Sequence, residues 1–271
     1  MRRVTAADGT SIAYEVFGRS QGTPVVMLQG LGTDSRGWAL QRFAFGRRHR
    51  CYAVDNRGVG GSAGAPRPFS LEQMADDAVA VLDAEGVERA HVMGASMGGV
   101  IAQMLAVRHP ARVRSLVLAC TSCRHHEWRR ELFQEWADEV EARGMGALGG
   151  DGLVWLVGPR LHRRFGLWIN LLARIAVPTL VITGSQDLLT PLGDAEELAE
   201  LIPDARLREL RGAAHGLMVE QPNAFNGAVL RFLDEVDEAG ASTAGGDAGS
   251  GSGVADAPSA AAVDEAFNQT A

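Results

Sequence analysis

A serine flanked by glycines two residues away on either side is the feature of this chain that most directly predicts chemistry. Residues 94–99 read Gly-Ala-Ser-Met-Gly-Gly, with Ser96 between a β-branched apolar run and an amphipathic run. A strand that turns at once into a helix forces the residue at the corner into a strained conformation, and only small neighbours fit around it. The spacing therefore predicts a nucleophile elbow, a sharp bend that exposes the hydroxyl of Ser96.

A serine hydroxyl is a poor nucleophile at neutral pH, so this chemistry needs a histidine base and a carboxylate that orients it. Both groups occur further along the chain. Asp187 follows an apolar run at 178–184, and His215 lies in a loop of small residues after a run at 205–210. We predict Ser96 as the nucleophile, His215 as the general base and Asp187 as the residue that fixes the imidazole.

Strands and helices that alternate along the chain must position these groups. The apolar runs before Ser96 and Asp187 read as buried strands, the run 205–210 before His215 reads as a further strand, and amphipathic segments such as 71–82 separate other strands. This alternation predicts a mainly parallel sheet with helices on both faces, preceded by a hairpin at 3–17. The segment 97–108 reads as a helix whose positive dipole end points at Ser96.

Two backbone amides are predicted to form an oxyanion hole. The apolar run 25–28 ends in Gln-Gly-Leu-Gly at 29–32, where the amide of Leu31 can face the elbow. Met97 begins the helix after the nucleophile and supplies the second amide. Losing one such donor typically lowers turnover on the order of 10²–10³. The alternative interpretation of 29–32 is a plain glycine turn after a strand.

These motifs together resemble those of the α/β-hydrolase family, closest in pattern to its esterases, enol-lactonases and cofactor-free haloperoxidases. The resemblance covers roughly residues 1–235 and includes the order nucleophile, acid, base along the chain. It implies an α/β fold with a mainly parallel sheet flanked by helices, whose core comprises 1–121 and 173–235 around a short helical cap at 122–172. The motifs are 29–32, 55–60, 94–98, 184–187 with Thr190 and Pro191, and 214–216.

The substrate pocket is where this chain departs from the family pattern. Many relatives have His-Gly before the oxyanion residue, whereas this chain has Gln29 followed by glycine. We expect substrate contacts from Gln29, Trp38, Trp128 and Met218. Trp128 belongs to a charged segment, 127–143, with aromatic residues at helical spacing, a pattern that packing of the cap on the core also explains.

The other candidate residues favour structural roles. Asp55 follows a strand and opens a turn-rich loop, where a turn aspartate is typical. Two thiols and nearby imidazoles, at Cys120, Cys123, His125 and His126, are legitimate zinc ligands, but Cys120 ends a buried strand and no second ligand pair follows. We therefore expect no metal and no cofactor. Packing or surface roles are expected for the remaining histidines outside the triad, which include His49, His91, His109 and His162.

Composition narrows the functional class further. The 271 residues carry a formal charge of -7, which argues against a nucleic-acid surface, and all 26 basic residues are arginine. A chain without lysine has neither a pyridoxal Schiff base nor a Walker-type phosphate loop. No apolar run approaches the roughly 20 residues of a membrane span, and the first residues lack an apolar signal core. The three cysteines are an odd number and do not form a secreted disulfide framework, so we expect a cytoplasmic protein. The segment 236–271 is rich in Gly, Ala and Ser and is expected to be a disordered tail.

The sequence thus predicts a serine hydrolase that cleaves a small carboxylic ester or lactone through an acyl-enzyme. Epoxide hydrolases and dehalogenases of similar fold are disfavoured, because the resembling elbow carries aspartate where this chain has Ser96. Two alternatives stay open: perhydrolase or haloperoxidase-type activity on the same triad, and a non-catalytic small-molecule-binding protein on a hydrolase scaffold. No oligomeric state is predicted.

Overall fold

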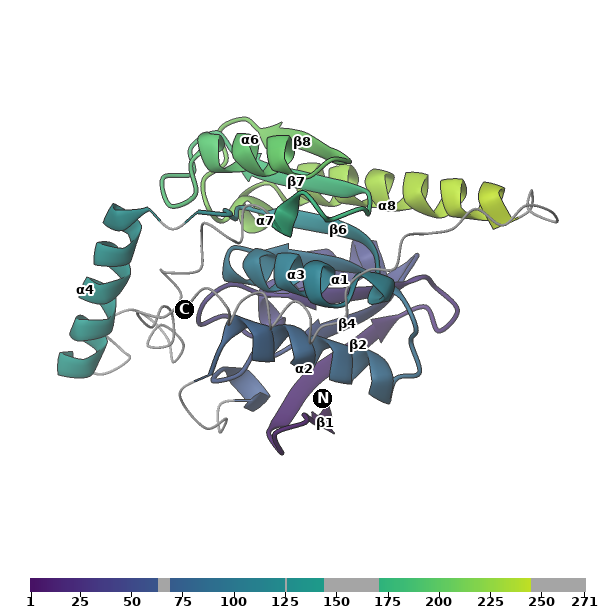
Figure 1. Ribbon diagram of the computed structural model, residues 1–271, viewed down its shortest axis with the longest axis horizontal. Helices are drawn as coiled ribbons and strands as arrows, with labels where there is room; N and C mark the ends of the chain where they lie inside the picture. The colour runs from purple at the N-terminus through teal and green to yellow at the C-terminus, as the bar shows by residue number, and fades with distance from the viewer. Residues whose placement is uncertain (63–68, 125, 144–170, 245–271) are drawn as a thin grey trace.

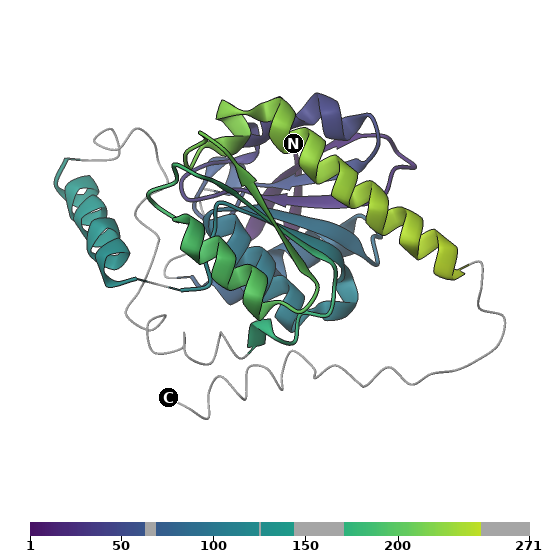
Figure 2. The same ribbon diagram turned by 90° about the horizontal axis from the view of Figure 1, so that it is seen from above.

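An eight-stranded sheet forms the centre of the molecule, with helices on both of its faces (Figures 1 and 2). The computed structural model describes residues 1–62, 69–124, 126–143 and 171–244. Within them the strand order is β1-β2-β4-β3-β5-β6-β7-β8. The strands are β1 (Arg2–Thr5), β2 (Ser11–Gly18), β3 (Pro24–Leu28), β4 (Arg50–Val54), β5 (Ala90–Ala95), β6 (Val113–Ala119), β7 (Thr179–Gly184) and β8 (Ala205–Leu210).

The described sheet is antiparallel at β1–β2 and β2–β4 and parallel in every pair from β4 to β8. This confirms the predicted N-terminal hairpin and the mainly parallel sheet. Parallel neighbours require a crossover segment, which the intervening helices provide. The helices are α1 (Ala39–Gly46), α2 (Leu71–Ala84), α3 (Met97–Arg108), α4 (Glu127–Arg143), α6 (Leu192–Leu201), α7 (Leu217–Glu220) and α8 (Pro222–Ala244), with short 3₁₀ turns η1 (Ser35–Trp38), η2 (Gly60–Ser62) and η3 (Pro110–Arg112).

Two apolar clusters cover opposite faces of the sheet. Strand β3 shows the pattern, because Val26 and Leu28 belong to the cluster under α2, α3 and α6, whereas Val25 and Met27 belong to the cluster under α1, α7 and α8. Side chains alternate between the faces of a strand, and a strand buried on both faces is apolar at every position. That is why the central strands read as continuous apolar runs in the sequence.

Helix α8 continues to Ala244 and so corrects the expectation of a disordered tail from residue 236. Val236 packs against the apolar cluster beneath the helix. Asp237 accepts a hydrogen bond from Thr23 Oγ1 at 2.7 Å and lies 3.1 Å from His91 Nε2. These contacts stabilise helical turns whose Gly- and Ala-rich composition gives little sign of a packed face. Residues 245–271 of the predicted tail lie outside the described part of the chain.

Helix α4 makes up most of the described part of the predicted cap and has the bounds expected from the sequence. Both views place it to one side of the sheet layers (Figures 1 and 2). Residues 144–170, which make up most of the predicted cap, lie outside the described ranges. Among the helices of the described ranges, none combines the length and the apolar character of a membrane span.

Candidate active site

The elbow at Ser96 has the strained geometry that its sequence predicts. Ser96 has φ 54° and ψ −122°, a backbone conformation that residues other than glycine rarely adopt. A Cβ on Gly94 would lie 2.1 Å from the carbonyl oxygen of Gly98, and a Cβ on Gly98 would lie 2.1 Å from that of Leu28. The two glycines are therefore required because α3 begins in contact with the ends of β5 and β3.

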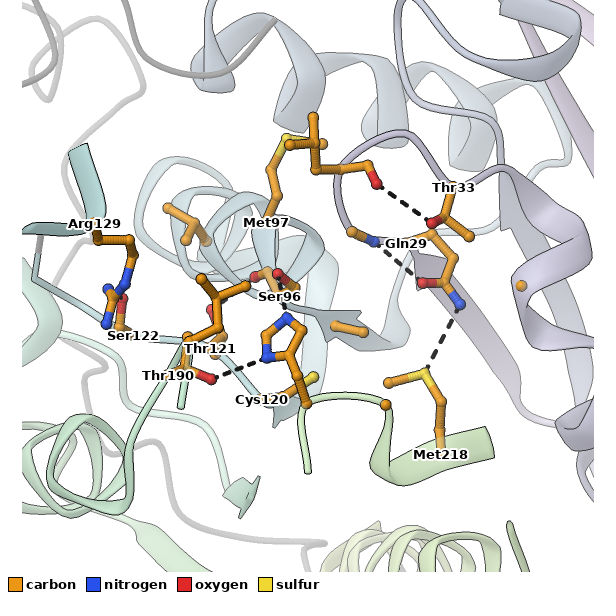
Figure 3. Close-up of a pocket in the computed structure, with 18 of the residues that line it drawn as sticks. Gln29, Thr33, Ser96, Met97, Cys120, Thr121, Ser122, Arg129, Thr190 and Met218 are labelled. Atoms are coloured by element: carbon orange, nitrogen blue, oxygen red, sulfur yellow. Dashed lines mark hydrogen bonds between the residues drawn. The ribbon is translucent and has the colours of Figure 1, made fainter. Parts of the chain in front are cut away.

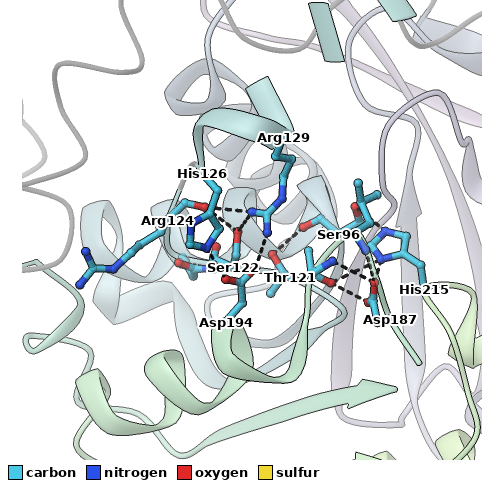
Figure 4. Close-up of polar contacts among 12 residues, drawn as sticks. Ser96, Thr121, Ser122, Arg124, His126, Arg129, Asp187, Asp194 and His215 are labelled. Atoms are coloured by element: carbon cyan, nitrogen blue, oxygen red, sulfur yellow. Dashed lines mark hydrogen bonds and ion pairs between the residues drawn. The ribbon is translucent and has the colours of Figure 1, made fainter. Parts of the chain in front are cut away.

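Tertiary structure brings together the three side chains predicted to act in series (Figure 4). His215 Nε2 lies 3.0 Å from Ser96 Oγ, and His215 Nδ1 lies 2.9 Å from Asp187 Oδ2. The residues follow the carboxyl ends of β5, β7 and β8, which meet at one edge of the parallel sheet. Each distance is within hydrogen-bonding range, so a proton can pass from the serine to the imidazole while the carboxylate holds the ring.

Asp187 is held rigidly by its own loop. Its Oδ1 accepts the backbone N–H groups of Leu189 and Thr190, each at 2.9 Å, and its Oδ2 accepts the Thr190 hydroxyl at 2.6 Å. Burial of the side chain would by itself raise the pKa of Asp187. The hydrogen bonds from His215 and Thr190 outweigh burial and lower the pKa below its usual value. The carboxylate therefore stays ionised beside the imidazole at neutral pH.

The loop after β3 runs directly against Ser96. A Cβ on Gly30 would lie 3.1 Å from Ser96 Cβ, and the cavity that contains Ser96 is also lined by Leu31 and Met97. Met97 is the first residue of α3, so its N–H has no acceptor within the helix. The two predicted oxyanion residues thus line the same cavity as Ser96.

Gln29 braces this loop from within. Its Oε1 accepts the N–H of Gly30 at 3.1 Å, and its Nε2 lies 3.9 Å from the sulfur of Met218 (Figure 3). Asn56 Nδ2 donates to the Gln29 carbonyl at 2.8 Å. The contribution of Asn56 was missed from the sequence, although it belongs to the 55–60 motif, which was the available signal. Asp55 beside it is fully buried and accepts the N–H of Ser35 at 2.8 Å, as a structural residue does.

A cavity of about 360 Å³ opens above the triad, with walls that are mostly apolar. Gln29 and Met218, two of the predicted substrate contacts, line it (Figure 3). Trp38 and Trp128 are not among its lining residues. Trp38 is fully buried in the apolar cluster under α1, because the turn η1 directs it toward the sheet. Trp128 is 42% exposed and stacks on His126 instead of reaching the cavity.

Helix α4 contributes different residues to the cavity than the sequence suggested. Arg129 and Phe133 line it, and these positions are four residues apart on one helical face, whereas Trp128 is rotated by about 100° from Arg129. Aromatic spacing identified the amphipathic helix but not which of its faces meets the core. The substrate contacts expected of Trp38 and Trp128 are therefore not found.

A buried ion pair anchors the start of α4 to α6. The Arg129 guanidinium contacts the Asp194 carboxylate and donates to Ser122 Oγ at 2.8 Å (Figure 4). His126 Nε2 lies 2.9 Å from the other oxygen of Asp194. Both partners of the Arg129–Asp194 pair are almost completely buried, so breaking it would leave an unpaired charge. The sequence did not reveal this pair, because its members are 65 residues apart.

The remaining described histidines lie outside the cavity, whereas one thiol, Cys120, lines the same cavity as Ser96 and His215. His49 and His91 are buried beneath α8, and His109 Nε2 lies 2.7 Å from Asp76. Cys120 and Cys123 are buried free thiols, and the described residues contain no group of three potential metal ligands. His125 and His162 lie outside the described ranges.

Comparison with known proteins gives this geometry a family context. A sequence profile of the α/β hydrolase fold matches residues 23–150. A protein of Azorhizobium caulinodans with the provisional name carbamate hydrolase RutD is 33% identical over 260 residues, which cover 83% of this chain and 96% of that protein. The 3-oxoadipate enol-lactonase 2 of Acinetobacter baylyi is 28% identical over 83% of this chain and 94% of that protein.

Solved structures agree with the sequence relatives. The crystal structure of the enol-lactonase from Burkholderia xenovorans matches with a TM-score of 0.75 and 28% identity, over 86% of this chain and 100% of that one. This chain therefore combines the observed strand order, the elbow at Ser96 and the loops that carry Asp187 and His215, and its sequence relatives are named as hydrolases. The chain belongs to the α/β hydrolase fold family.

Proposed function

We propose that this protein is a serine hydrolase that cleaves a small carboxylic ester or lactone, with Ser96, His215 and Asp187 as its catalytic triad. The observation that carries the proposal is the position of His215, 3.0 Å from the serine hydroxyl and 2.9 Å from the carboxylate. A hydrogen-bonded series of nucleophile, base and orienting acid supports covalent catalysis. A protein that only binds a ligand has no use for all three groups in this arrangement.

In the first half of the reaction, Ser96 Oγ attacks the carbonyl carbon and its proton passes to His215 Nε2. The carbonyl oxygen becomes an oxyanion, which the amides of Leu31 and Met97 stabilise. The bond between carbon and the leaving oxygen then breaks, and His215 gives its proton to that oxygen. The products of this step are an alcohol and an acyl-enzyme on Ser96; a lactone instead opens, and its alcohol stays attached to the acyl group.

In the second half, His215 accepts a proton from a water molecule that attacks the acyl carbon. The new tetrahedral intermediate collapses, Ser96 Oγ leaves and takes the proton from His215 Nε2, and a carboxylic acid is released. Throughout, Asp187 fixes the ring tautomer and stabilises the transient imidazolium. Atoms and charge balance with water as the one co-reactant.

The cavity indicates what kind of substrate fits. A volume of about 360 Å³ with mainly apolar walls suits a small acyl or ring system better than a polymer. The relatives named as enol-lactonases support a lactone. A carbamate is the second candidate, favoured by the name of the 33% identical relative. The same serine can attack a carbamate carbonyl, and the leaving amine or alcohol takes the proton from His215.

Hydrolysis of a graded panel of p-nitrophenyl esters, lactones and carbamates tests the proposal. Ser96→Ala should abolish turnover, whereas Ser242→Ala, on the exposed end of α8, should retain it. A fluorophosphonate probe should label the wild type and Ser242→Ala but not Ser96→Ala. A folded wild type that neither labels nor turns over any member of the panel would contradict the proposal and favour a binding protein.

A further inference from the structure

We propose that Thr121 is a positioning residue of the oxyanion hole, which acts through the peptide bond between Ser96 and Met97. Its hydroxyl donates a hydrogen bond to the Ser96 carbonyl at 2.7 Å (Figure 4). The inference rests on the proposed function, because an oxyanion hole has a use only if an acyl group is transferred at Ser96.

The planarity of the peptide unit links this hydrogen bond to the reaction. The Ser96 carbonyl and the Met97 N–H belong to one planar trans unit, so they point in opposite directions and turn together. Thr121 fixes the carbonyl and thereby fixes the direction in which the Met97 N–H points. Met97 begins α3 and its N–H is free of helical acceptors, so it is available to the oxyanion.

The hydrogen bond also changes the strength of that donor. A carbonyl that accepts a hydrogen bond polarises its peptide unit and makes the N–H on the other side a stronger donor. Negative charge on the substrate oxygen develops in the transition state, so a stronger donor lowers the barrier more than it tightens substrate binding.

The end of β6 is built to place Thr121 at this carbonyl. Ala119 accepts the N–H of Ser96 at 2.9 Å, and Cys120 donates its own N–H to Ile182 at 2.9 Å. Between these bonds the chain turns sharply, since Cys120 has φ 40°, a strained value for a residue other than glycine. The turn returns Thr121 to the elbow, so β6 holds the N–H of Ser96 through Ala119 and its carbonyl through Thr121.

The Thr121 hydroxyl is not needed to satisfy the carbonyl or to start the helix. The Ser96 oxygen also accepts the N–H groups of Gly99 at 2.9 Å and of Val100 at 3.4 Å. Thr121 is 3% exposed, lines the cavity, and would lie 2.6 Å from a Cβ placed on Gly99. Tight packing therefore holds the side chain in place, and its hydroxyl adds a third hydrogen bond to a carbonyl that already has two.

Thr121→Val and Thr121→Ser form a matched pair of tests. Valine keeps the shape and removes the hydroxyl, whereas serine keeps the hydroxyl and removes the methyl group. Polarisation strengthens a donor on the order of 10–30%, and a whole oxyanion donor contributes on the order of 10²–10³ in rate. The same percentage of the free energy behind that rate corresponds to a loss of about two- to eightfold. In Thr121→Val, kcat and kcat/KM for the best ester of the panel should fall together by this factor with KM unchanged, and Thr121→Ser should recover most of the rate.

A trifluoromethyl ketone gives a second readout that a packing defect would not reproduce. Its adduct with Ser96 carries an oxyanion, so its inhibition constant should rise in Thr121→Val by the factor that kcat/KM loses, while the affinity for the carboxylic acid product stays constant. The inference would be overturned by a wild-type kcat in Thr121→Val, or by equal losses of rate in the valine and serine variants. A change confined to KM would overturn it as well. An inactive wild type would instead overturn the proposed function, so the two failures are distinguishable.

Discussion

Replacing Gly98 by alanine separates the effect of tertiary contact from that of helix propensity. Gly98 is the second residue of α3, where alanine by itself favours the helix by about 0.8–1.0 kcal/mol. In the folded protein the added Cβ would lie 2.1 Å from the carbonyl oxygen of Leu28 and 2.7 Å from that of Gln29. Both are backbone atoms of the chain that leads into the oxyanion loop, so no side-chain rotation relieves the overlap.

The distances set the size of the effect. Ordinary van der Waals contact starts near 3.4 Å, so the start of α3 and the end of β3 must separate by roughly 1 Å. Overpacking of this kind costs typically 1–3 kcal/mol, against a helical gain of about 0.8–1.0 kcal/mol, so we expect a net destabilisation of up to about 2 kcal/mol. The shift separates Ser96 from Leu31, and a misplacement of about 1 Å can lower the rate about 10²-fold.

Gly193→Ala is the matched control. Gly193 is the second residue of α6, and a Cβ there meets nothing within 4 Å. It should stabilise the protein by about 0.5–1 kcal/mol and leave turnover unchanged. Urea denaturation followed by circular dichroism measures the free energy of unfolding, and ester hydrolysis measures kcat. A Gly98→Ala protein as stable and as active as Gly193→Ala would refute the reasoning.

Two further substitutions test the ionisation of Asp187 and of His91. Asp187→Asn should lower kcat on the order of 10⁴, as the equivalent change does in a serine protease triad, while the exposed Asp204→Asn should not. The folded pKa of Asp187 is lowered, so its carboxylate stabilises the fold at pH values above the ordinary pKa of 3.8, and this contribution should disappear from urea titrations as the pH falls below that value. Burial lowers the pKa of His91 below 6.5, so the unfolded chain binds the extra proton and stability should decline from pH 7 to pH 5. His91→Gln, which can still bond Ser115 and Asp237, should reduce that slope, and an unchanged slope would contradict the assignment.

The fold was accessible from the sequence because its central strands are buried on both faces. All four residues of the run 25–28 are apolar and fully buried, and the same pattern predicted a strand from the run 178–184, which the structure has at 179–184. Helix α2 also begins at the first residue of the predicted amphipathic segment 71–82, where Ser70 and Gln73 form a capping box. Period and capping are local properties, and local properties can be read from one segment at a time.

The residues that line the cavity could not be predicted in this way. Trp38 and Trp128 are large aromatic residues of the kind that often line pockets. Trp38 instead packs into the core, and Trp128 faces outward. Arg129 reached the cavity wall through its pairing with Asp194, a partner distant in the sequence. Helix α8 likewise extends past the composition change because Asp237 contacts His91 and Thr23. Each outcome depends on which surfaces meet, and hydrophobic periodicity does not encode that.

The sequence by itself determined the alternating strands and helices, the glycines around Ser96, and the order in which the serine, the acid and the histidine follow their strands. These follow from backbone geometry and side-chain period within short segments. Tertiary structure alone decided that His215 lies 3.0 Å from Ser96, although 119 residues separate them, and that Thr121 reaches the carbonyl behind the nucleophile. Those distances depend on the register of β5, β6, β7 and β8 in one sheet, and a register is a property of the assembled strands.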